Sequence, residues 1–463
     1  MRIVQVSHGF PPEQVGGAEW YTAHLANTLR ARGHEVLVFT RRADWRHPEY
    51  EVREERVDGL RVFRINNTWR ACPSFEESYH HGAIAKRFGE LLEALQPDLV
   101  HIQHVVGLST HIPDEAHQRQ IPVAMTFHDY WLLCNQGQLL QTDGSLCLHA
   151  STGACVDCAG LWLGMGTPAR RVLRVLERWR PDIRYRTSPL RQWAHRYLRM
   201  THQRPAQQSM MATRMQRRRQ EMLRLATSVD VGIVPSQTVW DQLVRSGIPA
   251  ERCILLPHGI PTKGLVRPTE ACPGTLRVTY CGQMIPAKGI HVLLEAAQQL
   301  HRTDVEVHLY GDVPPYGDIS EYATRMQRQA ARLPYVHWHG QYAHDALSRI
   351  FSKTDVVVVP SIWSENQPLV ILEAFAARIP VIATNLGGMA ELVRDGENGL
   401  LFPRGDTQAL AGCLARLADD RPLLERLRHG IEPIKDIETH AKELEEVYAS
   451  LLGCQVRHTR VVA

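Results

Sequence analysis

Short apolar segments alternate with longer amphipathic ones along the first 130 residues of the chain. The short segments are rich in valine and isoleucine at successive positions, which is typical of strands buried on both faces of a parallel sheet. They are Ile3–Val6, Val36–Thr40, Leu99–Gln103 and Val123–Phe127. The longer segments predict helices at Ala18–Arg32, which is followed by Gly33, and at Arg87–Leu95. The alternation predicts βαβ units with right-handed crossovers.

The alternation stops after Asp129 and resumes about a hundred residues later. Residues 130–158 hold four cysteines, and residues 159–225 are polar, basic and helical in pattern. Strands are predicted again at Val231–Val234 and Cys253–Leu256, with a helix near Thr238–Ser246 between them. The proline- and glycine-containing stretch from residue 257 to 274 then predicts an interdomain linker.

The second half of the chain repeats the same alternation. Its predicted strands are Arg277–Cys281, Glu306–Tyr310, Val336–Trp338, Asp355–Val359 and Val381–Ala383. Its predicted helices are Ile290–His301, Ala346–Ser352, Leu369–Ala377 and a last one near Glu438–Leu452. We therefore expect an N-terminal Rossmann-like domain at 1–258 with an insertion at 130–225, and a C-terminal one at 259–436. Residues 437–463 are expected to form a helix that crosses back to the first domain.

Length and composition agree with two domains that share a cleft. A chain of 463 residues with 44% hydrophobic residues is too long for a single core. Ten cysteines in such a chain favour a reducing compartment over secretion. The N-terminal segment shows no secretory leader, and no run of 18 apolar residues occurs. We expect a cytoplasmic protein, at most attached to the inner face of a membrane.

Two glycine-containing loops lie between a predicted strand and a predicted helix. Gly16 and Gly17 let backbone N–H groups approach a ligand at a helix N-terminus, which favours anions. The second loop contains Gln283 and ends at Lys288 and Gly289, adding a mobile cation to the same arrangement. The first loop could contact a phosphate or be a simple turn, and in the second Lys288 could bind a diphosphate or simply be solvated. The first lacks the GxGxxG spacing of dehydrogenases.

Residues 360–374 contain two glutamates that are eight positions apart. Pro368 suits the first position of a helix because it has no N–H to leave unsatisfied. Glu365 would then lie in the preceding loop, near a sugar, and Glu373 in the helix, where it could accept hydrogen bonds from ribose. Such a pair is also common on protein surfaces. The backbone N–H groups of Gln367, Leu369 and Val370 are expected to face the same bound ligand.

Together these motifs resemble those of glycosyltransferase family 4, whose GT-B fold has two facing Rossmann-like domains. The family's E-x7-E motif falls on Glu365 and Glu373, its lysine-glycine motif on Lys288 and Gly289, and its N-terminal glycine loop on Gly16 and Gly17. Residues 126–131 resemble the family's histidine-containing segment on the acceptor side. The resemblance covers about residues 1–135 and 228–452. Many members carry arginine at the position of Gln283, which leaves Lys288 as the expected side-chain cation.

The resemblance implies transfer of a hexose-type sugar from a nucleotide-diphosphate donor, with retention of configuration and no obligatory metal or other cofactor. Negative charge grows on the leaving diphosphate, and Lys288 and two helix N-termini would stabilise it. Glu365 would orient the sugar hydroxyls, and Glu373 would hold ribose. His128 would contact the donor sugar and help position the acceptor. It also follows a predicted strand, where functional groups gather.

Four cysteines in the expected insertion of the first domain form a separate candidate site. Cys155 and Cys158 have the C-x2-C spacing that lets two thiolates bind one tetrahedral zinc ion, and Cys134 and Cys147 precede them. A structural zinc would fix a segment that is too polar to form its own core. Reduced, partly buried thiols are the alternative.

Residues 159–225 carry a strong positive charge. They contain sixteen arginines, no lysine and three acidic residues, a net +13 in a chain whose total is +4. Tryptophan and leucine are interleaved with the arginines, which favours an anionic membrane surface. A solvated helical insertion and a nucleic-acid surface are the alternatives.

The favoured function is therefore a glycosyltransferase of glycan biosynthesis that acts on a saccharide or lipid-linked acceptor. A nucleotide-sugar hydrolase or epimerase with the same fold is the first alternative. A nucleic-acid-binding protein that uses the arginine-rich insertion is the second, and the intact set of Lys288, Glu365 and Glu373 argues against it.

Overall fold

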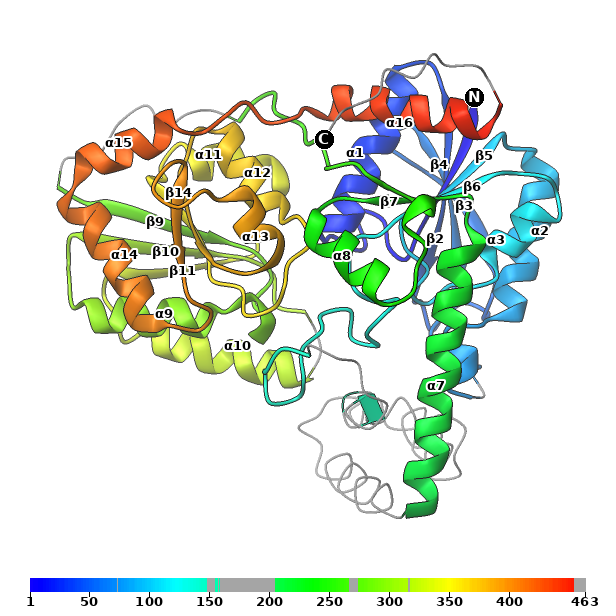
Figure 1. The fold of residues 1–463 in the computed structure, drawn as a ribbon, viewed down its shortest axis with the longest axis horizontal. Coiled ribbons are helices and arrows are strands. Elements are labelled where there is room, and N and C mark those ends of the chain that lie inside the picture. Colours follow the sequence, from blue (N-terminus) through cyan, green and yellow to red (C-terminus); the bar gives the residue numbers. More distant parts are fainter. Residues whose placement is uncertain are drawn as a thin grey trace.

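The computed structural model describes residues 1–72, 74–147, 155, 156, 158, 205–265, 274–314 and 317–453. They form two mainly parallel sheets that lie side by side, each covered by helices (Figure 1). The strand orders are β3-β4-β2-β1-β5-β6-β7-β8 and β11-β10-β9-β12-β13-β14. In each sheet the order reverses beside the first strand of a βαβ unit, so both domains are doubly wound, as predicted.

The strand boundaries follow the apolar runs of the sequence closely. The first sheet contains β1 (Arg2–Ser7), β2 (Glu35–Arg42), β3 (Val52–Val57), β4 (Leu60–Asn66), β5 (Leu99–Ile102), β6 (Val123–Thr126), β7 (Val231–Val234) and β8 (Cys253–Leu255). The second contains β9 (Leu276–Cys281), β10 (Val305–Tyr310), β11 (Val336–Gly340), β12 (Val356–Val359), β13 (Val381–Thr384) and β14 (Gly399–Phe402). Every residue of β12 is a buried valine, as expected where helices cover both faces of a sheet.

Helices cover both faces of each sheet. Those of the first domain are α1 (Gly17–Ala31), α2 (Gly82–Leu95), α3 (Ile112–His117), α7 (Pro205–Ser228) and α8 (Gln237–Arg245). Those that follow are α9 (Ile290–Leu300), α10 (Gly317–Ala330), α11 (Leu347–Phe351), α12 (Leu369–Ala376), α13 (Gly387–Leu392), α14 (Thr407–Asp419), α15 (Arg421–His429) and α16 (Ile437–Leu451). The side chains of β1 divide between two cores: Val4 and Val6 pack on one face and Ile3 on the other.

Three strands were not predicted from the sequence. β3 and β4 form an antiparallel hairpin at the edge of the first sheet, and its turn is Asp58-Gly59, with positive φ at both residues. An Asp-Gly pair is a known hairpin signal, but β3 is mostly polar because it lies at the edge. β14 is short and follows a turn, so its apolar run carries little periodic signal.

The last helix returns to the first domain. α16 lies along α1, at the top of the first domain in Figure 1. The Tyr448 hydroxyl forms a hydrogen bond with His101 Nδ1, at 2.7 Å. The Tyr21 hydroxyl forms one with His440 Nε2, at 2.6 Å. Leu444 joins the apolar core that α1 forms with the first sheet. The chain therefore crosses between the domains twice.

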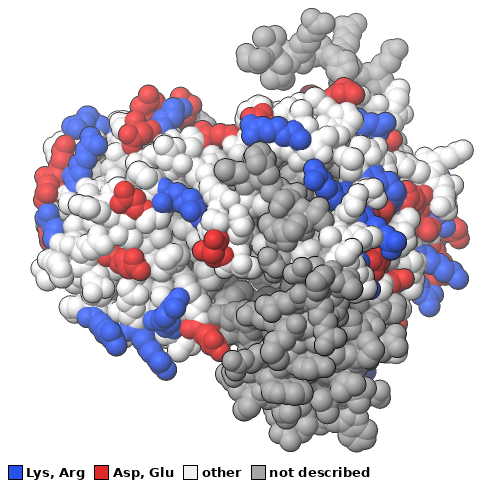
Figure 2. All heavy atoms as spheres, turned by 60° about the horizontal axis from the view of Figure 1, so that its bottom comes forward, with Lys and Arg blue, Asp and Glu red and all other residues white. Residues whose placement is uncertain are grey.

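Helix α7 projects from the first domain and joins the insertion to β7 (Figure 1). Where it reaches the domain, the buried Arg218 donates to the carbonyl oxygen of Trp131 at 2.6 Å and lies over the Trp131 ring. Residues 159–204 of the arginine-rich segment, for which a membrane contact was predicted, lie outside the described residues, whereas in the described part, 205–225, Arg218 is buried and Arg224 pairs with Asp114 and Glu221. Among the residues that are described, no helix has the length and apolarity needed to span a bilayer. On the face drawn in Figure 2, the basic and acidic side chains of the described residues are interspersed.

Candidate functional site

The two domains meet at loops that follow the carboxyl ends of their strands. Tyr130, after β6, hydrogen-bonds Ser364, after β12, with 3.1 Å between the hydroxyl oxygens. Asn366 Nδ2 reaches the carbonyl oxygen of Phe127 at 3.4 Å. Glu391 of α13 accepts hydrogen bonds from backbone N–H groups at the start of α8, at 2.9 and 2.6 Å. Ligands of doubly wound sheets bind at this kind of edge, so the candidate site lies at the junction.

Lys288 and Glu365 form a partly buried ion pair at this junction. Lys288 ends a short 3-10 helix, Pro286–Lys288, and its Nζ donates to Glu365 Oε1 at 2.6 Å. The same oxygen accepts hydrogen bonds from Ser361 Oγ at 2.6 Å and Trp363 Nε1 at 2.9 Å. Glu365 is only 4% exposed, whereas the Lys288 side chain is 27% exposed. The carboxylate thus holds the ammonium group in place while leaving one side of it accessible.

Gly289 brings the lysine loop against the loop that follows β12. It has φ +71°, and a Cβ there would lie 1.8 Å from the carbonyl oxygen of Pro360. Two residues before Gly289 and two residues after Pro360, the same loops are joined by a hydrogen bond from Ile362 N to Ala287 O at 2.9 Å. Glycine is therefore required both for the left-handed backbone conformation and for the close approach.

Gly289→Ala is expected to lower the free energy of unfolding by about 1–3 kcal/mol, because it adds backbone strain and a clash with Pro360. Gly412→Ala is the matched control. Gly412 lies inside α14 with no atom within 4 Å of its added Cβ, so this variant should gain about 0.5–1 kcal/mol. Urea denaturation of both variants measures the difference. Equal stabilities would contradict the packing described here.

Glu373 lies inside α12, and its side chain is 13% exposed. Burial raises the pKa of this carboxyl to about 7. His344 Nε2 lies 3.4 Å from Glu373 Oε1, but burial, together with the nearby His24, lowers the pKa of His344 to about 4. A neutral imidazole cannot compensate a carboxylate charge, so Glu373 is poised to lose or gain a proton near neutral pH. Trp20 of α1 stacks on His344, with 4.4 Å between the rings.

A cavity of about 800 Å³ opens beside these residues, after β10 and β11. This volume is typical of small-ligand sites. The cavity is lined by Tyr310, His339, Gln341, Tyr342, Ala343, Asp345, Ala346, Arg349, Ile350 and Lys353. His344, between two of the lining residues, connects it to Glu373.

On the side of the first domain, His128 is held by neighbouring rings. Its Nε2 lies 2.7 Å from Gln103 Oε1, and its ring packs against those of Tyr21 and His258, at centroid distances of 5.0 and 5.1 Å. Burial, helped by the neighbouring His104, lowers the pKa of His128 to about 3. His128 is therefore neutral at physiological pH and can take part in hydrogen bonds without carrying charge.

Sequence analysis missed an ionic cluster around the start of α1. His8 Nε2 lies 3.0 Å from Glu19 Oε1, and His104 Nε2 lies 3.2 Å from Asp129 Oδ2. Burial opposes ionisation of Glu19, but the charge and hydrogen bond of His8 outweigh it and lower its pKa to about 2. Gly16 is the N-cap of α1, and a Cβ added to it would lie 2.6 Å from Glu19 Oε2. The helix start therefore already has an anion beside it, a feature that the sequence Gly16-Gly17-Ala18-Glu19 could have suggested.

The remaining predicted donor residues have different surroundings. Gln367 Oε1 accepts a hydrogen bond from the backbone N–H of His258 at 2.7 Å. Leu369 packs against the first domain, and a Cβ on Gly17 would lie 3.8 Å from it. Val370 packs against the core of the second domain, and Gln283 is half-buried.

Pro368 was expected at the first helical position but is the N-cap of α12. Its ψ of 114° is extended, because the chain arrives from the loop that holds Glu365. The helix start nevertheless faces the domain junction, since Leu369, its first residue, contacts the first domain.

The four clustered cysteines are all among the described residues, and each is half-buried. Burial, followed by the charges of Cys147, Cys134 and Cys158, raises the pKa of the Cys155 thiol to about 11. The thiols are thus near one another, but in the described part of the chain they form no group of three donors within 4.8 Å. A zinc ion here stays a prediction.

Two family models match the chain. "Glycosyltransferase Family 4" matches residues 15–146, and "Glycosyl transferases group 1" matches residues 275–420. Alpha-D-kanosaminyltransferase of Streptomyces kanamyceticus is 29% identical over 203 residues, 41% of this chain and 51% of that protein. The amylovoran biosynthesis glycosyltransferase AmsK of Erwinia amylovora is 26% identical over 232 residues, 47% of this chain and 56% of that protein. The matches therefore span about half the length of these relatives.

Solved structures share the fold over nearly the whole chain. Sucrose-phosphate synthase from Thermosynechococcus elongatus has a TM-score of 0.66 at 21% identity, covering 98% of this chain and all of that one. HepE from Anabaena, solved with UDP and glucose, has a TM-score of 0.62 at 18% identity, covering 97% and 99%. The predicted GT-B architecture is confirmed by these likenesses. With both domains matched by family models, the chain belongs to glycosyltransferase family 4.

Proposed function

We propose that this protein transfers a hexose-type sugar from a nucleotide-diphosphate donor to a saccharide or lipid-linked acceptor during glycan biosynthesis. The observation that carries the proposal is the Lys288–Glu365 pair at the domain junction. A half-exposed ammonium group held by a buried carboxylate is a preorganised cation, which suits a site where negative charge develops. The UDP complex of the similar HepE fold supports a nucleotide donor.

The reaction would proceed with retention of configuration and without an obligatory metal. As the glycosidic bond breaks, Lys288 would stabilise the diphosphate together with the N-terminus of α12. Glu365 would position Lys288 through Oε1, and its Oε2 would orient the sugar hydroxyls. Gln283 and the backbone of Gly16 and Gly17 would complete the diphosphate site.

The other assignments follow from where the side chains lie. Glu373 would accept hydrogen bonds from the ribose hydroxyls, because it lies 3.4 Å from His344, which stands between Ala343 and Asp345 in the lining of the cavity that could hold the nucleoside. Neutral His128 would contact the donor sugar and position the acceptor. Domain 1–258 would bind the acceptor and domain 259–436 the donor, with residues 437–463 linking back to the first.

Two further proposals concern the insertion and its surroundings. Cys134, Cys147, Cys155 and Cys158 would bind a structural zinc ion. The arginine-rich segment would dock the enzyme on the anionic inner face of the cytoplasmic membrane, whereas nucleic acid is a weaker candidate. Sedimentation with anionic and neutral vesicles distinguishes the membrane from a packed, solvated insertion.

A thermal-shift panel of UDP-, GDP-, ADP- and TDP-sugars tests the donor assignment. The true donor at 100 times its dissociation constant should stabilise the fold by about 2.7 kcal/mol.

Transfer with this donor should persist in excess EDTA at short times, because Lys288 and helix N-termini supply the positive charge. Immediate loss that Mg²⁺ or Mn²⁺ restores would contradict the metal-independent mechanism. Rapid release of free sugar without acceptor would favour the hydrolase alternative.

A further inference from the structure

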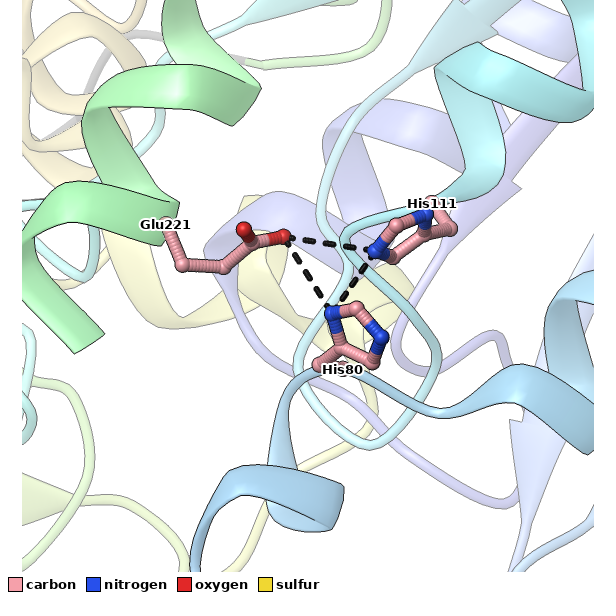
Figure 3. Close-up of side chains that lie close together, drawn as sticks. All are labelled: His80, His111 and Glu221. Carbon is pink, nitrogen blue, oxygen red and sulfur yellow. Dashed lines mark hydrogen bonds and ion pairs between the residues drawn. The ribbon is translucent and has the colours of Figure 1, made fainter. Parts of the chain in front are cut away.

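Two histidines and a glutamate from three separate segments meet where α7 docks on the first domain. His80 lies in the loop before α2, His111 is the N-cap of α3, and Glu221 lies in α7. Figure 3 shows His80 Nδ1, His111 Nε2 and Glu221 Oε1 pointing toward one another. These donor atoms lie within 4.8 Å of one another, and none of the three residues belongs to the site described above.

The two imidazole nitrogens lie at hydrogen-bonding distance from each other, but the carboxylate oxygen lies farther away, and a metal ion could be placed between all three atoms. The two nitrogens are 2.7 Å apart, and each lies 3.7 Å from the carboxylate oxygen. The centre of this triangle lies about 2.0 Å from each corner, which is the usual length of a zinc–nitrogen or zinc–oxygen bond. The two 3.7 Å separations are too long for hydrogen bonds.

Groups around the triangle orient these donors. Asp114 Oδ2 lies 2.8 Å from His111 Nδ1, so the Nδ1 proton is directed to Asp114 and the Nε2 lone pair faces the centre. Arg224 contacts both Asp114 and Glu221, and Thr110 Oγ1 donates to Glu221 Oε1 at 2.5 Å. The carboxylates of Asp114 and Glu221 and the guanidinium of Arg224 together carry a net charge of −1, which favours binding of a cation.

We propose that His80, His111 and Glu221 bind a divalent transition-metal ion of the zinc class. The ion has three protein ligands and an open position toward solvent, because the His80 side chain is 48% exposed. It fastens α7 to the loops before α2 and α3. Arg218, one helical turn from Glu221, contacts Trp131 beside the domain junction, so the metal also positions that segment. This site is independent of the proposed transferase activity.

The test is a titration of the EDTA-treated full chain with ZnCl2 and with CoCl2. Apart from any Co²⁺ held by the four cysteines, the wild type should bind one Co²⁺ that gives d–d absorption without a sulfur charge-transfer band, and Zn²⁺ should raise its melting temperature. His80→Ala and His111→Ala should each weaken binding at this site at least 100-fold. Asp114→Asn should weaken it about 10- to 100-fold. His117→Ala is the control, because His117 lies in the same α3 but pairs with Asp230, at 2.9 Å.

Binding by the four cysteines is distinguished by its sulfur charge-transfer band, which Cys155→Ser would remove while leaving the histidine site intact. The metal-free melting temperature of His80→Ala should equal that of the wild type, since His80 is exposed, so misfolding cannot imitate the result. Unchanged stoichiometry and affinity in both histidine variants would overturn the proposal. So would a wild-type protein whose only bound Co²⁺ shows thiolate ligation.

Discussion

Lys288→Ala is expected to lower kcat/KM for sugar transfer by about 10²–10³-fold, with the larger part of the loss in kcat. The charge on the diphosphate is greatest when the glycosidic bond is breaking, so a fixed ammonium group stabilises the transition state more than the bound donor. Single-turnover kinetics and calorimetric donor titration separate the two contributions. Lys263→Ala is the control, because Lys263 pairs with Glu438 and its side chain is 87% exposed.

The same variant should also lose stability, and a second substitution separates this effect from catalysis. Without Lys288, the buried Glu365 keeps hydrogen bonds from Ser361 and Trp363 but no cation, which should cost about 1–3 kcal/mol. Lys288→Ala combined with Glu365→Gln removes the unpaired charge, so stability should recover while activity stays low. If Lys288→Ala alone retained activity within threefold of the wild type, the assigned role of Lys288 would be wrong.

The fold was largely predictable because local patterns determine it. Runs such as Val356–Val359 are typical of strands buried on both faces, and Gly33 follows the first helix as expected. The β3–β4 hairpin was missed because an edge strand is mostly polar, although Asp58-Gly59 is a turn signal. A strand at the edge of a sheet is exposed to solvent and largely polar, so its hydrophobic pattern is too weak to predict it.

The contacts of the candidate site could not be predicted in the same way. Motif spacing led to Lys288 and Glu365, but it did not indicate that the two side chains pair with each other. That contact depends on the packing of two loops through Gly289, a tertiary feature. The meeting of His80, His111 and Glu221 is still less visible, because their three segments are brought together only by the docking of α7.

Replacing Glu373 by glutamine should make the protein more stable than the wild type at pH 8.5, but not at pH 4.5. The pKa of this carboxyl is about 7 in the folded protein and about 4.5 in the unfolded chain. The folded state therefore holds a proton that the unfolded state releases between these values. Its stabilising contribution is complete below pH 4.5 and is lost as the pH rises through 7. The shift corresponds to about 3 kcal/mol.

Urea denaturation of Glu373→Gln and the wild type across this pH range measures that difference directly. Glu446→Gln, at an exposed position of α16, is the control and should follow the wild type at every pH. Donor binding supplies an independent test, because ribose hydroxyls bind an ionised carboxylate more strongly than a protonated one. Wild-type donor affinity should thus fall as the pH drops from 8 to 6, whereas Glu373→Gln should bind about tenfold more weakly at pH 8 and show no such dependence. A wild-type affinity that is flat across pH 7 would separate Glu373 from ribose, and it would leave the burial of this carboxyl as a feature of packing alone.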